Sequence, residues 1–263
     1  MSKNLLKNNK IKSYHTSKYP IVLFIMYIGQ LFISEDSLSQ GFDWQNGARF
    51  PYVIPNLYVG VSTSYSGSVH NGNFNLKEDL IDCCSFTDGS GNEQSFGIVT
   101  EYWYDGLTAL SANINFSAIK GDFSVRTVLP TREGEFVSDY GFNSTLKYLD
   151  LELLVRRRIG ISHFSAGAGL NLGFLLTSEG VYTEQAVSDN VPFERRILST
   201  GTIRDLRSFS LSPFVYLAYD ANLGTGYYAS PNLSLSYTLN SIIAEESWRR
   251  LSISFGIRIV RSI

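Results

Sequence analysis

Residues 146–176 read LKYLDLELLVRRRIGISHFSAGAGLNLGFLL and set a pattern that the rest of the chain repeats. In the first half of this stretch, apolar side chains alternate with charged or polar ones, which is the period of a β-strand. The apolar set is Leu149, Leu151, Leu153 and Val155, and the alternating set is Tyr148, Asp150, Glu152 and Arg156. The second half repeats the alternation with Phe164, Ala166, Ala168, Leu170, Leu172 and Phe174. The stretch therefore predicts two strands joined by a tight turn near residues 157–160.

The polar faces of these two strands indicate which side of the sheet meets water. The apolar residues of the second strand alternate with His163, Ser165, Gly167, Gly169, Asn171 and Gly173. Small and polar residues of this kind cannot fill an apolar core. Together with carboxylates they suit the wet interior of a narrow barrel whose aliphatic face is turned to lipid. We therefore expect a β-barrel that crosses a membrane.

The composition narrows the possible functions. The 263 residues are compatible with one all-β domain, and 16 Tyr, 17 Phe and only 17% charged residues suit strands with aromatic girdles. A formal net charge of -2 leaves no basic surplus for binding nucleic acid. The three histidines are scattered and the two cysteines, Cys83 and Cys84, are adjacent, so no spacing indicates a metal site. We expect no cofactor; the cysteines could form a disulfide with each other, bridge to another molecule or remain a free pair.

The N-terminal residues have the pattern of an export signal. Residues 1–18 are polar and basic, and the apolar run 21–33 has the length of a signal-peptide core and is too short to span a bilayer as a helix. Ser37 and Ser39 supply the small residues that a signal peptidase reads. We therefore predict a signal peptide over residues 1–39, a periplasmic lead-in over 40–55 and the barrel over 56–263. An uncleaved anchor at the N-terminus is the alternative.

Alternating segments recur eight times in residues 56–263, joined by connections of alternating length. Long polar connections are expected at 67–94, 119–144 and 178–207, a connection of medium length at 240–247, and short turns between the other strands. This asymmetry is typical of outer-membrane barrels, which have short periplasmic turns and longer external loops. The sequence thus predicts an all-β fold, an eight-stranded antiparallel transmembrane up-and-down β-barrel in the cell outer membrane. The predicted strands are 57–65, 96–104, 110–117, 148–156, 163–174, 209–219, 227–237 and 251–259.

Two prolines fall inside predicted strands. Pro213 and Pro231 lack the N–H that a strand donates to its neighbour, and a closed barrel has no free edge to accommodate them. They are equidistant from a predicted turn centred at Asn222. We therefore expect them to face each other at a bulge or a locally opened pair.

Charged residues on the polar faces define the candidate site. If the apolar faces meet lipid, these charges point into an interior barely wider than its side chains. Isolated charges there would be costly, so we expect ion pairs and hydrogen bonds that plug the lumen. A gated or proton-conducting path is the alternative. The predicted lumenal network consists of Glu101, Asp150, Glu152, Arg156 and Arg258.

A catalytic pair is a further alternative. His163 and Ser165 lie two residues apart on one strand face, where they could act as base and nucleophile, and they resemble the His-x-Ser element of barrel-shaped lipid A deacylases. The alternation points both side chains inward, and the nearby turn places them at the periplasmic end, remote from outer-leaflet lipid. A hydrolase acting on lipid A is therefore the least favoured function.

The segment Lys147–Leu154 resembles a strand motif of the PorT-like family of small outer-membrane β-barrels, a group that also includes OmpA-like barrels. The strand with Ala166, Gly167, Ala168 and Gly169 and the closing strand 251–259 are also similar. The resemblance implies an outer-membrane β-barrel domain. A resemblance to PorT itself implies a role in protein secretion, although the members of the family share no single activity.

Three classes of function remain after this reading. The first is a non-enzymatic outer-membrane protein with a plugged lumen, whose external loops serve envelope structure or contact extracellular or envelope proteins. The second is a narrow pore or transporter, or a secretion accessory of the PorT type. The third is a soluble lipocalin-like barrel, whose polarity would be inverted. For the favoured class we expect outer-membrane lipid as the immediate partner and no enzymatic activity.

Overall fold

The computed structural model describes residues 57–74, 85–131, 134–160, 162–188, 191–192, 195–224 and 226–263. The predicted signal peptide, the lead-in, Cys83 and Cys84 lie outside the described residues. Within the described part, no helix has the length and apolar character that a membrane span requires.

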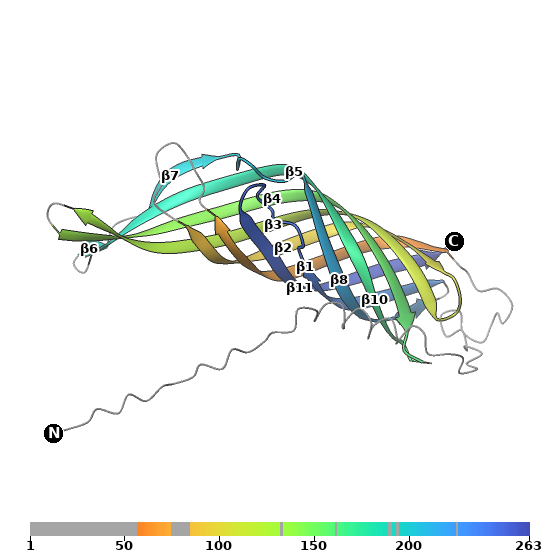
Figure 1. Ribbon diagram of the computed structural model, residues 1–263. Helices are drawn as coiled ribbons and strands as arrows, with labels where there is room; N and C mark the ends of the chain where they lie inside the picture. The colour runs from red at the N-terminus through yellow and green to blue at the C-terminus, as the bar shows by residue number, and fades with distance from the viewer. Residues whose placement is uncertain are drawn as a thin grey trace, which may run out of the picture. The chain divides into compact units, whose positions relative to one another are not determined.

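Eight strands form a closed antiparallel ring, which confirms the predicted fold class (Figure 1). Each strand pairs with its neighbour along the ring, and β11 closes it by pairing with both β1 and β10. Three short strands, β6 (Val191–Pro192), β7 (Arg196–Gly201) and β9 (Ala221–Gly224), lie outside the ring. The ring strands are β1 (Leu57–Phe74), β2 (Phe86–Trp103), β3 (Thr108–Thr131), β4 (Gly134–Arg158), β5 (Phe164–Ser188), β8 (Phe209–Tyr219), β10 (Tyr227–Tyr237) and β11 (Ser247–Ser262).

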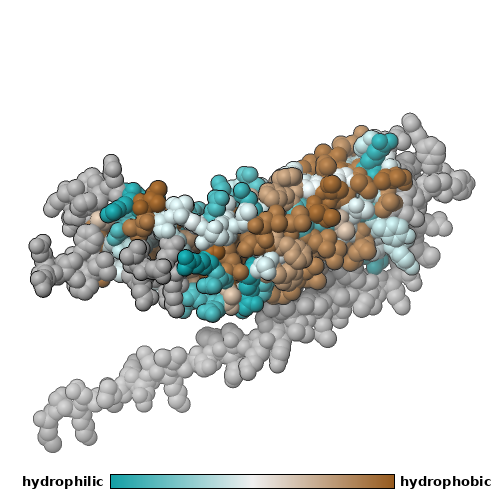
Figure 2. Space-filling view, turned by 90° about the horizontal axis from the view of Figure 1, so that it is seen from above, coloured by the Kyte–Doolittle hydropathy of each residue, from teal (hydrophilic) through white to brown (hydrophobic). Residues whose placement is uncertain are grey.

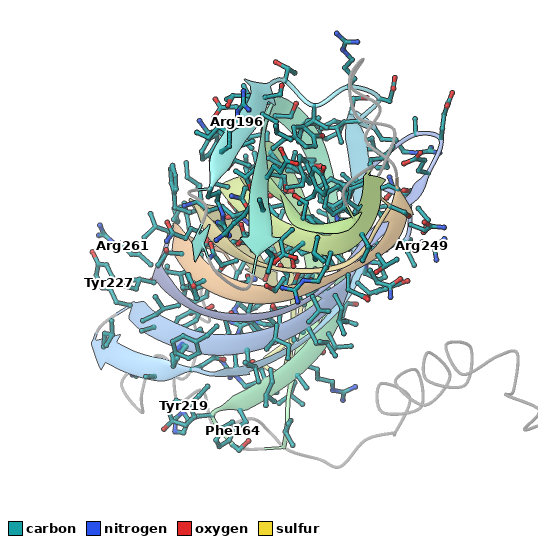
Figure 3. The ribbon with its side chains drawn as sticks, turned by 90° about the vertical axis from the view of Figure 1, so that its left-hand side faces the viewer. Phe164, Arg196, Tyr219, Tyr227, Arg249 and Arg261 are labelled. Carbon is teal, nitrogen blue, oxygen red and sulfur yellow. The ribbon has the colours of Figure 1, made fainter. Side chains whose placement is uncertain are left out.

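The outside of the ring carries an apolar belt. The register places exposed apolar residues side by side; Val61 of β1, for example, pairs with Ile98 of β2 and Ile259 of β11. Figure 2 shows the belt as a hydrophobic band over one part of the molecule, with hydrophilic residues beyond it. At one rim, Phe164, Tyr219 and Tyr227 project outward from the ring (Figure 3). A closed ring with an aliphatic exterior and an aromatic rim is the architecture of a transmembrane β-barrel of the outer membrane.

Short turns lie at the aromatic rim. The turn between β4 and β5 falls at the predicted place and contains Gly160, whose φ of 60° is in the left-handed region that favours glycine. Since barrels of this class keep their short turns in the periplasm, this rim is the periplasmic end and the opposite rim is extracellular.

The predicted long loops are largely strands, and this part of the sequence prediction was wrong. Residues 119–144 belong to one hairpin, in which β3 and β4 pair continuously from Thr108 with Arg157 to Thr131 with Gly134. The predicted loop 67–94 contains the end of β1 and the start of β2, and 178–207 contains the end of β5 with β6 and β7. The alternation continues in these segments, but most of their outward residues are polar because they lie beyond the lipid belt.

The part of the hairpin that rises past β2 is called the extracellular extension. It consists of residues 124–131 of β3, 134–141 of β4 and 183–188 of β5, beyond the last pair of β2 with β3, Gly89 with Phe123. Arg126 and Asp139 face each other on it and form two parallel hydrogen bonds of 2.6 and 2.8 Å. This bidentate contact lowers the pKa of the Asp139 carboxyl, chiefly through the hydrogen bond from Arg126.

The two prolines do not face each other, which corrects the sequence prediction. Pro213 lies opposite Leu170 of β5, and Pro231 lies opposite Ile257 of β11. The predicted turn centre was wrong because β9 prolongs the hairpin past residue 220 and pairs with the start of β10. The ladder between β8 and β10 ends at Phe214 with Ser236, immediately beside Pro213, as expected for a residue without an N–H.

Candidate functional site in the lumen

Arg156 is the centre of the periplasmic half of the lumen. Its side chain is fully buried, and it reaches from β4 to a carboxylate on each of two other elements. Nη2 lies 2.8 Å from Glu101 on β2, and Nη1 lies 2.7 Å from Asp220, which follows β8. Arg156 also donates hydrogen bonds to Ser165 Oγ at 3.2 Å and to Tyr228 Oη at 2.8 Å. One guanidinium thus binds residues of β2, β5 and β10 and the acid that follows β8.

The two carboxylates around Arg156 have further donors. The Tyr228 hydroxyl donates to Glu101, and the Ser230 hydroxyl donates to Asp220. A buried ion pair contributes to stability only when hydrogen bonds satisfy its remaining polar atoms. The hydroxyls of β10 provide part of that satisfaction for both acids.

A second arginine extends the network toward the middle of the barrel. Arg258 of β11 lies 2.5 Å from Glu152 of β4 and 3.7 Å from Glu101. Its guanidinium also lies over the ring of Tyr216 at 4.6 Å, and Asn113 donates to Glu152 at 2.6 Å. Glu101 therefore links the two arginines. We call Glu101, Glu152, Arg156, Asp220 and Arg258 the arginine layer.

Aromatic side chains close the lumen on the periplasmic side of the arginine layer. Arg156 and Arg158 lie 5.0 and 4.3 Å from the ring of Trp103, within the range of cation–π attraction. Tyr58 packs edge-on against Tyr228, with ring centroids 5.2 Å apart. Together with Val99, Ala109 and Val260 these rings form one buried cluster. The periplasmic end is therefore filled by charge and aromatic surface in contact.

All five sequence-predicted residues point into the barrel, and the structure joins four of them. Glu101, Glu152, Arg156 and Arg258 form one continuous chain of ion pairs, whereas Asp150 is separate. Asp150 accepts hydrogen bonds from Ser117 and, at 3.4 Å, from Asn171, and no ion pair among the described residues includes it.

Sequence reasoning missed several members of the lumen. Asp220 was placed in a turn, and Tyr228 was not singled out, although each shares the face of inward neighbours on its own segment. The pair of Glu93 with Arg250, at 2.7 Å, was missed because residue 93 was assigned to a loop. The alternation that identifies Glu101 as inward also identifies Glu93, so a longer β2 would have revealed it.

The glycines of β5 make room for side chains that cross the lumen. A Cβ at Gly169 would lie 2.5 Å from the ring of Phe214, and one at Gly173 would lie 2.7 Å from Asp150. Larger residues on this face of β5 would therefore displace the interior. The glycine-rich face noted in the sequence is a requirement of lumen packing.

A small polar cavity lies in the middle of the barrel. Its volume is about 70 Å³, enough for a few water molecules. Its walls are mainly hydroxyl and amide side chains, with Asp150, Glu152 and Arg258 among the charged ones. The cavity is the wet part of the lumen, between the arginine layer and a second obstruction.

That second obstruction is an apolar cluster at the extracellular side, which we call the apolar stopper. Five aromatic side chains from five strands form its centre, and Phe74 stacks on Trp248 with ring centroids 5.2 Å apart. Ile203, Ile242 and Ile243 from the connections after β7 and β10 pack onto it. The five aromatic residues are Phe74, Phe86, Phe123, Phe142 and Trp248.

A buried histidine ties the apolar stopper to the barrel wall. His70 accepts a hydrogen bond from Trp248 Nε1 at its Nδ1, at 3.0 Å, and its Nε2 lies 3.1 Å from the Ser68 hydroxyl. Because Nδ1 accepts, the neutral ring carries its proton on Nε2. His70 therefore acts as a structural acceptor that orients the indole of Trp248.

Ser165 and His163, the two residues considered for catalysis, contact different side chains. Ser165 accepts a hydrogen bond from Arg156, while the ring of His163 lies against Tyr219, with centroids 5.6 Å apart. No described residues form a group of three or more His, Cys, Asp or Glu able to hold a metal ion. The arrangement is suited to filling and stabilising the lumen.

Comparison with known proteins gives distant structural likenesses only. No family model matches the chain, and no curated protein matches its sequence. Ail, the attachment invasion locus protein of Yersinia pestis, is 12% identical over 79% of this chain and 99% of its own, with a TM-score of 0.32. Neisserial surface protein A is 10% identical over 79% and 97%, with a TM-score of 0.31. The outer membrane protease OmpT from Escherichia coli is 9% identical over 80% and 98%, with a TM-score of 0.33. The outer-membrane assignment of this chain rests on its own closed ring, apolar belt and short-turn rim.

Proposed function

We propose that this chain is a non-enzymatic outer-membrane scaffold with a plugged lumen. The barrel holds the strands of its extracellular side in place, and its role is to support the envelope or to bind partners at the cell surface. The observation that carries the proposal is the double obstruction of the lumen. The arginine layer fills the periplasmic half and the apolar stopper fills the extracellular half, with only a cavity of about 70 Å³ between them. A solute would have to displace both to cross.

The extracellular extension is the part of the scaffold best placed to meet a partner. Its strands continue the barrel wall beyond the apolar belt, and β7 pairs with β5 beside it, so it presents ordered β-structure. Exposed side chains such as Arg126 and Val128 face outward there. Extracellular or envelope proteins are the partners that this geometry supports.

Conductance in planar bilayers tests the proposal. The full chain should insert without producing single-channel steps, while an open porin in the same membrane conducts. Insertion is verified with proteoliposomes of the same lipid. The protein recovered from them should be folded, which is recognised by a change in its electrophoretic mobility on heating. Reproducible single-channel steps from the unmodified chain would overturn the plugged scaffold and favour the narrow pore or transporter.

A role as a PorT-like secretion accessory is the second candidate, supported by the motif at Lys147–Leu154. On β4 the alternate residues Tyr148, Asp150, Glu152 and Leu154 face the lumen, and the others face outward. The test is secretion by cells that lack the chain. A secretion defect restored by the full chain and by a variant without the extracellular extension would favour the accessory role over surface interaction.

A further inference from the structure

The outer wall of the barrel has a hollow within the apolar belt. On β1, Thr63 pairs with Phe96 of β2 on one side and Ile257 of β11 on the other, and its short side chain lies between two larger ones. In the next outward row, Tyr65 lies between Gln94 and Phe255. The result is a hollow of about 410 Å³ over Thr63.

Three aromatic rings frame this hollow. Tyr65, Phe96 and Phe255 are 55%, 62% and 64% exposed, and all three line the hollow. The hydroxyl of Thr63 donates to the carbonyl oxygen of Ser95 at 3.1 Å. The Thr63 hydroxyl on the floor is therefore paired within the protein, which lowers the cost of covering it with an apolar ligand.

We propose that this hollow binds one acyl chain of a membrane lipid. It opens from the belt directly into the hydrocarbon, where acyl chains are the surrounding solvent. Large rings on several sides offer an acyl chain many atoms to contact, and dispersion attraction accumulates over such contacts. Gln94 lies at the extracellular edge of the hollow, where its amide can hydrogen-bond an ester or headgroup oxygen.

The shape of the site favours a lipid over a second copy of the chain. A stable protein interface buries about 1,600 Å² in total and needs an extended complementary face. The hollow is local, being framed by Tyr65, Phe96, Phe255 and Ile257 around one threonine. One flexible chain fills such a space without requiring a matching surface around it.

Native mass spectrometry of the full chain tests the proposal, with Thr63→Phe to fill the hollow. The matched control is Ala112→Phe on β3, where the small outward residue lies between Thr100 and Leu153. After stepwise delipidation, the unmodified chain and Ala112→Phe should each retain one phospholipid per barrel, and Thr63→Phe should lose it. Equal lipid retention in Thr63→Phe and Ala112→Phe would overturn the site. A dimer of the unmodified chain that Thr63→Phe abolishes would show that the occupant is a second copy.

Photo-crosslinking keeps the proposal testable if Thr63→Phe fails to fold. A phospholipid with a diazirine in its acyl chain is incorporated into vesicles with the unmodified barrel. Labelled peptides should contain Tyr65, Phe96 or Phe255 in preference to Phe174 and Phe209, an exposed aromatic pair elsewhere on the belt. Uniform labelling of both groups would contradict a specific site.

Discussion

Arg156 holds two carboxylates at once, so its removal leaves Asp220 buried without a cation and leaves Glu101 with only the more distant Arg258, at 3.7 Å. Breaking a buried pair in this way costs about 3–5 kcal/mol. We expect Arg156→Met to lower the free energy of unfolding by that amount in guanidinium titrations of the micelle-bound protein. Arg126→Met, at the exposed pair on the extracellular extension, is the control and should change stability little.

Neutralising the acids as well distinguishes lost pairing from lost packing. In Arg156→Met combined with Glu101→Gln and Asp220→Asn, no unpaired charge is left, so much of the stability should return. If the triple variant is no more stable than Arg156→Met, packing around the guanidinium is the dominant contribution.

Substitution by phenylalanine should destabilise the protein more at Trp248 than at Trp103. Trp248→Phe deprives the buried Nδ1 of His70 of its donor and should cost about 1–3 kcal/mol of unfolding free energy. The indole N–H of Trp103 has no hydrogen-bond partner among the described residues, so Trp103→Phe should cost clearly less. Thermal unfolding of the two variants side by side provides the measurement. Equal losses would mean that the hydrogen bond to His70 contributes nothing.

At the residue scale, the alternation of apolar and polar residues predicts whether a side chain faces the lumen. It is a poorer guide to which other side chains that residue contacts. It identified Glu101, Glu152, Arg156 and Arg258 as inward, because a strand has only two faces. It could not show that Arg156 would contact Asp220. That contact depends on the pairing registers of β4 with β5 and of β5 with β8, which the alternation does not specify. The separate position of Asp150 has the same origin.

At the scale of elements, the extracellular extension should be dispensable for folding. Joining Val125 to its partner Tyr140 by an Asn-Gly turn removes residues 126–139 and keeps every aromatic residue of the apolar stopper. We expect this variant to reach the membrane and to retain heat-modifiable mobility in electrophoresis. Failure to fold would show that the extension is part of the folding core.

A deeper cut in the same hairpin is the control for that prediction. Joining Ser117 to its partner Tyr148 removes Phe123, Phe142 and Leu146 from the apolar stopper. This variant should lose the folded band or show it only at low temperature. If both cuts are tolerated equally, the apolar stopper contributes little to barrel stability.

The ion pair on the extension predicts a pH effect of defined sign. Because Arg126 lowers the pKa of Asp139, the pair contributes stability above the ordinary carboxyl pKa, and this contribution is lost as pH falls through the lowered value. Carbon-detected NMR titration of the Asp139 carboxyl should give a midpoint below about 3.9. In Arg126→Gln the midpoint should rise toward that value; an unchanged midpoint would mean that the pair does not form in solution.

The number and order of the ring strands were predictable from the sequence, but their lengths were not. Membrane crossings have alternating apolar and polar residues, which is a strong signal. Beyond the belt the outward residues become polar, as at Lys120 and Asp122, so β3 continues without an apolar outer face. The inner faces still carry Ile119 and Phe123 of β3 and Tyr140 and Phe142 of β4, and this period of two was the available sign that residues 119–144 pair as a hairpin.

At the scale of the whole molecule, two obstructions in series predict that neither one alone controls conduction. Phe123→Ala with Phe142→Ala should thin the apolar stopper, and Arg156→Ser with Glu101→Ser and Trp103→Ala should thin the periplasmic obstruction. Each set alone should remain silent in planar bilayers, since the remaining obstruction still fills an interior that is only about as wide as its side chains. The combined variant should give small single-channel steps, because the polar cavity would then connect with both mouths.

Folding of every variant is verified by heat-modifiable mobility before recording. Steps from the first set alone would show that the arginine layer is permeable to ions, and a folded but silent combined variant would place a third obstruction in the lumen.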